Sequence, residues 1–330
     1  MVSATSRRMV QRGIAKVVEG IEQSEGAGAR VRRSIGNMSV RNFNPFLMFD
    51  HFKLNGPNGF PEHPHSGQET ITYCLQGLIA HEDLMGNKGM LYPGDLQFMT
   101  AGKGIVHLEM PVEPKDGLGA QLLQLWVDLP AKLKECEPRY RDLREWEIPV
   151  ARSEDGLTEV KVISGKLFGV ESVKDLAYTP VEFLHFILKK GASFKQELNP
   201  DFSYFLYNIK GNGLTLNGSK KIKQYENVFF ANDGGDYITG EATGDDEFIL
   251  VGGQRLDQPV VQHGPFVQTL RDKIIQKFTD YQYARGGFEK VRDWQTLISG
   301  GVTEDMINGP LGGNLEEREK AKQAYLKSHA

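Results

Sequence analysis

The chain has 330 residues, of which 39% are hydrophobic and 25% are charged, and its formal net charge is −4. This composition is typical of a globular protein and excludes a disordered chain or one built to bind polyanions. No stretch approaches the roughly 18 apolar residues of a membrane span. We therefore expect no membrane contact. The two cysteines, Cys74 and Cys136, are too few for a disulfide framework, so we expect a reducing compartment.

Two segments near the start of the chain are basic. The first 18 residues contain basic but no acidic side chains, as in a weak transit peptide. We interpret them as an exposed basic leader, and a mitochondrial or plastid address remains the alternative. Arg30, Arg32 and Arg33 form a second group, which we interpret as a solvated face. This group is too small to predict direct nucleic-acid binding.

Between about residues 30 and 130, short apolar or alternating runs are separated by clusters of glycine, proline and asparagine. Many short strands with regular turns indicate a β-sandwich or barrel. The pattern is lost over residues 128–147, which we interpret as a connection. The expected strands include 45–49, 70–75, 90–92, 96–99 and 121–127, and the expected turns include 55–59, 86–87 and 93–95.

The strand pattern begins again after the connection, with glycine and asparagine turns of the same kind. The similar spacing of strands and turns in the two halves indicates two related β units, which we place at residues 1–140 and 141–330. Helical spacing of apolar residues predicts a helix over about 271–283, ended by Gly286 and Gly287. The charged segment 315–327 is a second expected helix. The expected strands of this half include 158–163, 182–188, 203–209, 213–216, 228–231 and 247–251.

Two short motifs carry most of the chemical information. His63 and His65 flank a proline, and His107 and Glu109 flank a leucine. Alternate residues of a strand point to the same face, so each motif can direct two side chains at one point. Three imidazoles and one carboxylate suit a divalent transition metal. Proline restricts both its own backbone and the residue before it, so His63 is held extended and the ligand geometry is preset.

Several other residues compete for a role in this site. Glu69 follows His65 by four residues, and spacing alone leaves it open as the fourth ligand in place of Glu109. His81 and Asp83 form another such pair, but they lie in a polar segment flanked by turns, and we expect a structural hydrogen bond for His81. His51 is also interpreted as structural.

The second half of the sequence serves as an internal control. Residues 196–200 stand where the first half has its two histidines, and Phe248 and Leu250 stand where it has His107 and Glu109. We therefore expect one metal, held by the N-terminal half. Phosphate-binding glycine loops, a serine nucleophile elbow and paired zinc-binding cysteines are all absent from the sequence.

Eight runs between about residues 22 and 295 carry a specific pattern, in which an HPH motif is followed about 40 residues later by HxE, after a PGD turn. The runs are QSEGAGARVRRSIG, NPFLMFDHF, GFPEHPHSGQET, AHED, YPGDLQFMTAGKGIVHLEMP, QLLQLWVDLP, PVVQHGPFV and GGFEKVRDW. Together they resemble the pirin family of the cupin superfamily.

The resemblance implies an all-β bicupin, with two jelly-roll-like β-barrel domains and short C-terminal helices. It implies that the N-terminal cupin domain binds a metal, usually iron as Fe(II), through His63, His65, His107 and Glu109. It thereby favours Glu109 over Glu69, which spacing did not decide. It places no metal ligands in the C-terminal cupin domain.

The resemblance also implies two alternative functions. The first is a quercetin 2,3-dioxygenase-type reaction, in which a flavonol-like substrate reacts with O₂ and Glu109 accepts the proton of the substrate hydroxyl. The second is an iron-dependent redox-sensing co-regulator that binds transcription factors in the nucleus, with Arg30, Arg32 and Arg33 as a candidate partner surface. We expect a cytoplasmic or nuclear monomer without direct nucleic-acid contact.

Overall fold

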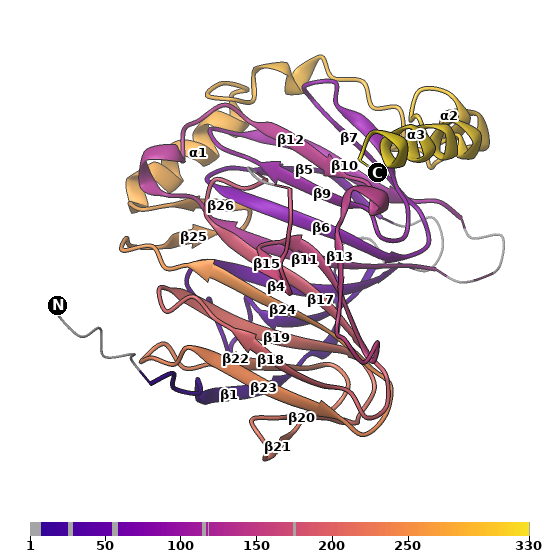
Figure 1. Ribbon diagram of the computed structural model, residues 1–330. Coiled ribbons are helices and arrows are strands. Elements are labelled where there is room, and N and C mark those ends of the chain that lie inside the picture. The colour runs from indigo at the N-terminus through magenta and orange to yellow at the C-terminus, as the bar shows by residue number, and fades with distance from the viewer. Residues whose placement is uncertain are drawn as a thin grey trace, which may run out of the picture. The chain divides into compact units, whose positions relative to one another are not determined.

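The computed structural model describes residues 8–25, 29–54, 59–113, 117, 119–173 and 176–329. Most of the expected turn at 55–59 and the first seven residues of the leader lie outside the described residues. The described residues divide into two compact units, whose elements are labelled in Figure 1. Unit A comprises the described residues of Ile21–Glu147, Asp175–Thr179 and Leu256–Ala330, and unit B those of Met1–Gly20, Ile148–Lys174 and Pro180–Arg255.

This division differs from the predicted domains, 1–140 and 141–330, at both ends of the chain. The N-terminal strand β1 (Ile14–Glu19) pairs with β22 (Glu226–Phe230), more than 200 residues away, and so belongs to unit B. The C-terminal helices instead belong to unit A. Both assignments depend on non-local pairing, which a residue-by-residue pattern does not reveal.

Unit A contains a seven-stranded antiparallel sheet, in the order β12-β9-β6-β11-β4-β3-β2, and a four-stranded sheet, in the order β5-β10-β7-β8. The strands are β2 (Ile21–Glu25), β3 (Ala29–Ile35), β4 (Phe46–Leu54), β5 (Phe60–His65), β6 (Gln68–Gln76), β7 (Ile79–Asp83), β8 (Lys88–Leu91), β9 (Leu96–Thr100), β10 (Ile105–Pro111), β11 (Ala120–Asp128), β12 (Arg139–Leu143) and the separate hairpin β25 (Val261–His263) with β26 (Phe266–Gln268).

Register places an apolar row across the seven-stranded sheet. Val31 pairs with Phe52, Phe52 with Leu122, and Leu122 with Cys74. All four are buried in one hydrophobic cluster. Cys74 is thus a free cysteine that packs as a small hydrophobic residue.

Unit B repeats the arrangement with a seven-stranded sheet, β1-β22-β19-β24-β17-β14-β13, and a four-stranded sheet, β18-β23-β20-β21. Its core holds Phe186 stacked on Phe248 at 4.7 Å between ring centroids, with Phe194 beside both. Aromatic rings thus fill the core of this unit. The remaining strands are β13 (Val150–Arg152), β14 (Thr158–Ser164), β15 (Lys166–Leu167), β16 (Val170–Glu171), β17 (Val181–Leu188), β18 (Ser193–Glu197), β19 (Phe202–Lys210), β20 (Leu214–Leu216), β21 (Lys220–Lys221), β23 (Tyr237–Ala242) and β24 (Asp246–Gln254).

The interpretation of the leader as exposed is wrong for Arg12, although residues 8–11 are exposed. Strand β1 pairs with β22, and Arg12 is buried in unit B at 1% exposure. The Arg12 guanidinium donates to the backbone oxygens of Asn199, Phe202 and Gly235. A buried guanidinium needs this degree of hydrogen bonding. Residues 11–19 are therefore a structural part of unit B.

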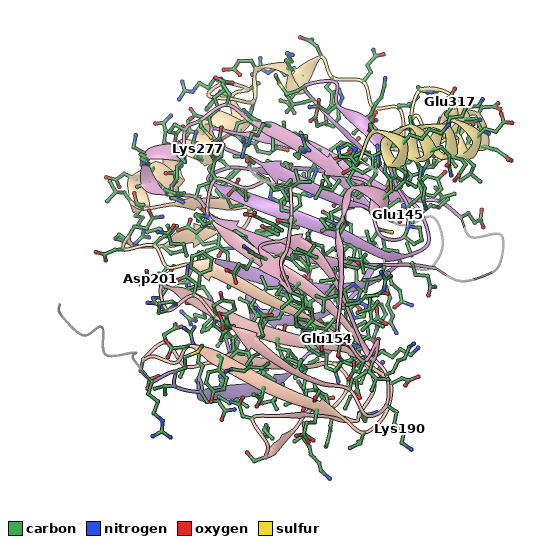
Figure 2. All side chains as sticks on the ribbon, viewed as in Figure 1. Glu145, Glu154, Lys190, Asp201, Lys277 and Glu317 are labelled. Carbon is green, nitrogen blue, oxygen red and sulfur yellow. The ribbon has the colours of Figure 1, made fainter. Side chains whose placement is uncertain are left out.

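The predicted all-β architecture with C-terminal helices is confirmed. Lys277 of α1 (Arg271–Gln282) is labelled in Figure 2. Its ammonium group donates to Glu135 at 2.6 Å and to the backbone oxygen of Lys103 at 2.7 Å. Lys322 of α3 similarly reaches Glu145 at 2.6 Å. Among the described residues, no helix combines the length and apolar character needed to cross a membrane. The helical segments are α1 (Arg271–Gln282), α2 (Glu304–Asn308), α3 (Leu315–Ser328) and the 3₁₀ turns η1 (Ala131–Leu133), η2 (Glu145–Glu147) and η3 (Glu289–Arg292).

Candidate metal centre

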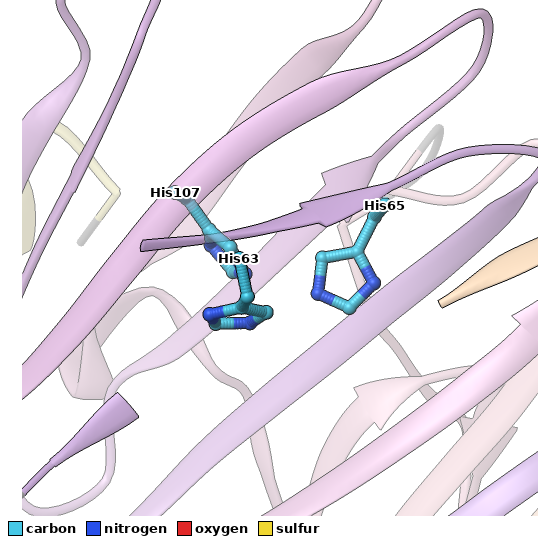
Figure 3. Close-up of side chains that lie close together, drawn as sticks. All are labelled: His63, His65 and His107. Atoms are coloured by element: carbon cyan, nitrogen blue, oxygen red, sulfur yellow. The ribbon is translucent and has the colours of Figure 1, made fainter. Parts of the chain in front are cut away.

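Antiparallel pairing of β5 with β10 brings the two histidine motifs together. His63 lies directly opposite His107, and His65 lies opposite Ile105. Figure 3 shows the rings of His63, His65 and His107 gathered at one point. One ligand atom from each of the three lies within 4.8 Å of the others. The cluster predicted from the i, i+2 spacing is thus present for all three histidines.

The spacing of the imidazole nitrogens fits a shared metal ion. His107 Nε2 and His63 Nε2 are 3.0 Å apart. Two neighbouring ligands at ~2.1 Å from an octahedral ion would lie about 3 Å from each other. His63 Nδ1 donates to the Pro61 carbonyl at 2.8 Å, which leaves the Nε2 lone pair directed at the cluster. Gln68 Nε2 lies 3.0 Å from His65 Nδ1 and fixes the orientation of that ring.

The protonation of the cluster also suits a metal. Burial lowers the pKa of His63, and it lowers the pKa values of His65 and His107 well below the usual imidazole value. The rings are therefore neutral at pH 7, which is the form that binds metals. His107 Nδ1 is buried without a hydrogen-bond partner among the described residues.

Glu109 lies two residues after His107 on β10, with its side chain buried. Its carboxylate is not part of the tight three-histidine group. It lines the same pocket as His63 and His65, and Glu109 Oε1 lies 3.5 Å from Thr72 Oγ1. Burial raises the pKa of Glu109 to about 7, while His81 and the Thr72 hydroxyl act in the opposite direction. Glu109 remains the predicted fourth ligand.

The carboxylate of Glu69, the alternative ligand, is occupied elsewhere. It accepts hydrogen bonds from the Thr100 hydroxyl at 2.7 Å and from the backbone amides of Tyr178 and Thr179 at 2.9–3.1 Å. Three donors satisfy a buried carboxylate. The geometry gives Glu69 a structural role, in agreement with the choice of Glu109.

The other candidate pair does not form a metal site. His81 Nε2 faces Asp142 Oδ2 at 3.6 Å, and its ring stacks on Tyr140. Asp83 instead accepts bonds from the backbone amides of Met85 and Asn87 in the turn after β7. Both residues therefore contact structural partners.

A pocket of about 940 Å³ opens beside the histidines within unit A. Its volume is in the range of small-molecule sites. The His65 ring contacts Trp126 edge-on, with 5.0 Å between ring centroids. The ring centroids of Phe60 and His63 are 6.4 Å apart. The residues that line this pocket include Arg33, Asp50, Phe52, Phe60, His63, His65, Glu109, Gln124 and Trp126.

A row of polar side chains crosses the sheet, two residues from the apolar row. Arg33 pairs with Asp50, Asp50 with Gln124, Gln124 with Thr72, and Thr72 with Gln97. We call these five residues the polar row. The sequence analysis missed this row, because no single strand shows which of its polar residues align across the sheet.

Arg30 is exposed, as expected of a solvated face, but Arg32 and Arg33 are partly buried, and all three arginines have carboxylate partners. Arg30 and Arg32 pair with Glu22 at 2.6 and 2.9 Å. Arg33 makes a bidentate pair with buried Asp50 and lines the pocket. The three arginines have carboxylate partners because β3 lies between β2, which carries Glu22, and β4, which carries Asp50.

Comparisons with known proteins agree with this description. The family model Pirin matches residues 28–127, and the model of the Pirin C-terminal cupin domain matches residues 183–287. Pirin from Homo sapiens is 42% identical over 280 residues, which span 84% of this chain and 94% of that protein.

Two solved structures show the same fold. Quercetin 2,3-dioxygenase from Acinetobacter baumannii has a TM-score of 0.78 at 23% identity and covers 84% of this chain and 99% of its own. A bacterial pirin from Escherichia coli, solved in complex with nickel(II), has a TM-score of 0.58 at 21% identity and covers 73% of this chain and 99% of its own.

Fold and site together define a bicupin, with two cupin domains and, in one of them, a histidine cluster that could bind a metal. The chain belongs to the pirin family. The family and fold class expected from the sequence are both confirmed.

Proposed function

We propose that the chain is an Fe(II)-dependent dioxygenase that opens a flavonol-like substrate with O₂ and releases carbon monoxide. One observation carries the proposal: the three-histidine cluster lies beside a pocket of about 940 Å³ that combines aromatic walls with a buried carboxylate. The flavonol class comes from the quercetin 2,3-dioxygenase that shares the fold, and it is part of the proposal.

His63, His65 and His107 would hold the metal, with Glu109 as the fourth ligand. When bound, the metal supplies Lewis acidity toward a substrate hydroxyl and the means to react with O₂. Phe60 and Trp126 offer apolar faces to the substrate rings.

Glu109 has the second chemical role. Its carboxylate lines the pocket close to the histidines, where it would accept the hydroxyl proton. The Thr72 hydroxyl lies 3.5 Å from Glu109 Oε1, beside the carboxylate at the pocket wall.

The experiment uses the full chain, freed of metal and then loaded with Fe(II) without oxygen. We expect one iron per chain, and carbon monoxide release when quercetin and oxygen are added. His63→Ala and His107→Ala should abolish both. His329→Ala, an exposed histidine near the C-terminus, is the matched control and should behave as wild type.

Two results would contradict different parts of the proposal. Unchanged iron content in a His65→Ala, His107→Ala double variant would show that the site assignment is wrong. Full iron content without carbon monoxide would show that the activity is wrong while the site stands.

No specific observation in the structure favours the co-regulator hypothesis. The arginines proposed as its partner surface are ion-paired, and Arg33 lines the pocket. The nuclear or cytoplasmic location and the monomeric state remain predictions.

A further inference from the structure

Gln124, a buried member of the polar row, has a hydrogen-bond donor without a partner among the described residues. Arg33 and Asp50 bond each other at 2.7–2.9 Å, and Gln97 Nε2 reaches Asp142 at 3.5 Å. Thr72 Oγ1 bonds Gln124 Oε1 at 2.7 Å. In the described part of the chain, Gln124 Nε2 has no hydrogen-bond partner, although Gln124 is only 4% exposed.

The contact with Thr72 determines which end of the amide faces the pocket. A 2.7 Å separation is typical of an O–H···O bond, whereas N–H···O bonds are usually about 2.9–3.0 Å long. The hydroxyl therefore donates to the amide oxygen, and the amide NH₂ group is left for the pocket. Because Thr72 and Gln124 are register partners on β6 and β11, the sheet itself maintains this orientation.

The position of Gln124 connects this donor to the metal centre. Gln124 lines the same pocket as His65, Glu109 and Trp126. The Thr72 hydroxyl that orients Gln124 lies 3.5 Å from Glu109 Oε1. The donor and the candidate metal ligands thus face one ligand-sized space.

We propose that Gln124 is a specificity residue that donates a hydrogen bond to an oxygen acceptor of the bound ligand. The proposal rests on the proposed function, because it assumes an aromatic hydroxyl directed at the histidines. The site would then select aromatic ligands that carry a carbonyl next to that hydroxyl. A buried donor left without a partner costs about 1–3 kcal/mol, so a ligand lacking the carbonyl is penalised.

The test compares two probes on the metal-loaded protein without oxygen, so that binding is measured without turnover. 3-Hydroxyflavone carries the carbonyl beside its enolic hydroxyl, whereas 3-hydroxyflavan lacks the carbonyl and has an aliphatic hydroxyl. The role of Gln124 is therefore measured by the change in affinity for each probe between wild type and variant. Gln124→Met, which keeps the volume but removes the donor, should lose about tenfold in affinity for 3-hydroxyflavone and little for 3-hydroxyflavan.

Two further variants separate the donor from general packing. Thr72→Val leaves Gln124 in place but releases its amide, and it should cause a smaller loss for the same probe. Gln121→Leu changes a glutamine of the same strand whose side chain lies on the other face, and it should bind both probes as wild type does. Metal content, measured for every variant, should be unchanged.

The contradictory results are distinct. If wild type binds 3-hydroxyflavone and Gln124→Met binds it equally well, the role of Gln124 is refuted and the proposed function stands. If wild type prefers a ligand with a hydroxyl in place of the carbonyl, the amide has the reverse orientation and the donor role is refuted. If metal-loaded wild type binds neither probe, the proposed function fails and this inference fails with it.

Discussion

Glu82 Oε1 accepts a hydrogen bond from the backbone amide of Leu297 at 2.6 Å. This bond attaches residues 294–311, here called the tail, to β7. Strand β7 pairs with β10, the strand that carries His107 and Glu109. The alternate residues of β10, Leu108 and Met110, pack in a cluster with residues of the tail. The tail thus covers one face of β10 while the candidate metal ligands occupy the other.

The first prediction concerns this attachment. Glu82→Ala should lower the free energy of unfolding by about 1–3 kcal/mol, because it leaves the amides of Leu297 and Ile298 without their acceptor. Urea unfolding measures the loss, and hydrogen exchange should accelerate at those two amides. Glu316→Ala, in the exposed first turn of α3, is the control and should change neither. Unchanged exchange in Glu82→Ala would show that the bond does not hold the tail.

The second prediction separates the two candidate carboxylates. Glu109→Gln should weaken metal affinity at least tenfold, since even outer partners of metal ligands have effects of about 10- to 100-fold. Glu69→Gln should keep wild-type metal affinity but lower stability, because a neutral amide accepts weaker bonds from Thr100, Tyr178 and Thr179. Metal titration and urea unfolding check both variants. The opposite pattern would make Glu69 the ligand.

Local sequence patterns were sufficient for the three histidines. The i, i+2 spacing of His63 and His65 sets their shared direction on a strand, and pairing of β5 with β10 adds His107. The polar row could not be predicted in the same way. Asp50 and Gln124 each belong to a strand with other polar residues, and only the register across β4 and β11 shows that these two align.

Non-local contacts also explain the error in the N-terminal segment. Its basic composition suggested an exposed leader, because Arg12 has no nearby acidic partner in the sequence. In the structure, the partners of Arg12 are backbone carbonyls about 190–220 residues away, at Asn199, Phe202 and Gly235. Backbone acceptors leave no trace in composition, so this burial was invisible to a charge count.

The third prediction follows from that burial. Arg12→Ala should destabilise the protein by roughly 2–4 kcal/mol, because three buried carbonyl groups lose their donor. Thermal or urea unfolding measures the change. Arg8→Ala, at an exposed position, should stay within about 0.5 kcal/mol of wild type. Equal stability of the two variants would restore the interpretation of this segment as a dispensable leader.

The fourth prediction concerns the pH dependence of stability. Burial lowers the pKa of His51 to about 4, with Lys53 and Arg32 adding to the shift. Between the unfolded pKa of about 6.5 and this folded value, the unfolded chain binds a proton that the folded chain does not. Stability is therefore lost as the pH falls from about 6.5 toward 4, by about 2 kcal/mol between pH 7 and pH 5.

His51→Gln removes this titration. We call the loss of unfolding free energy from pH 7 to pH 5 the pH slope, and it should be about 2 kcal/mol smaller in His51→Gln than in wild type. Urea unfolding of the metal-free proteins at pH 7 and pH 5 gives the comparison. The other buried histidines contribute equally to both proteins, because only the difference between the two slopes is used. His329→Gln should keep the wild-type slope, since this histidine is exposed. Identical slopes for wild type and His51→Gln would mean that His51 is protonated in the folded protein, and that its burial is compensated by a partner other than the cations beside it.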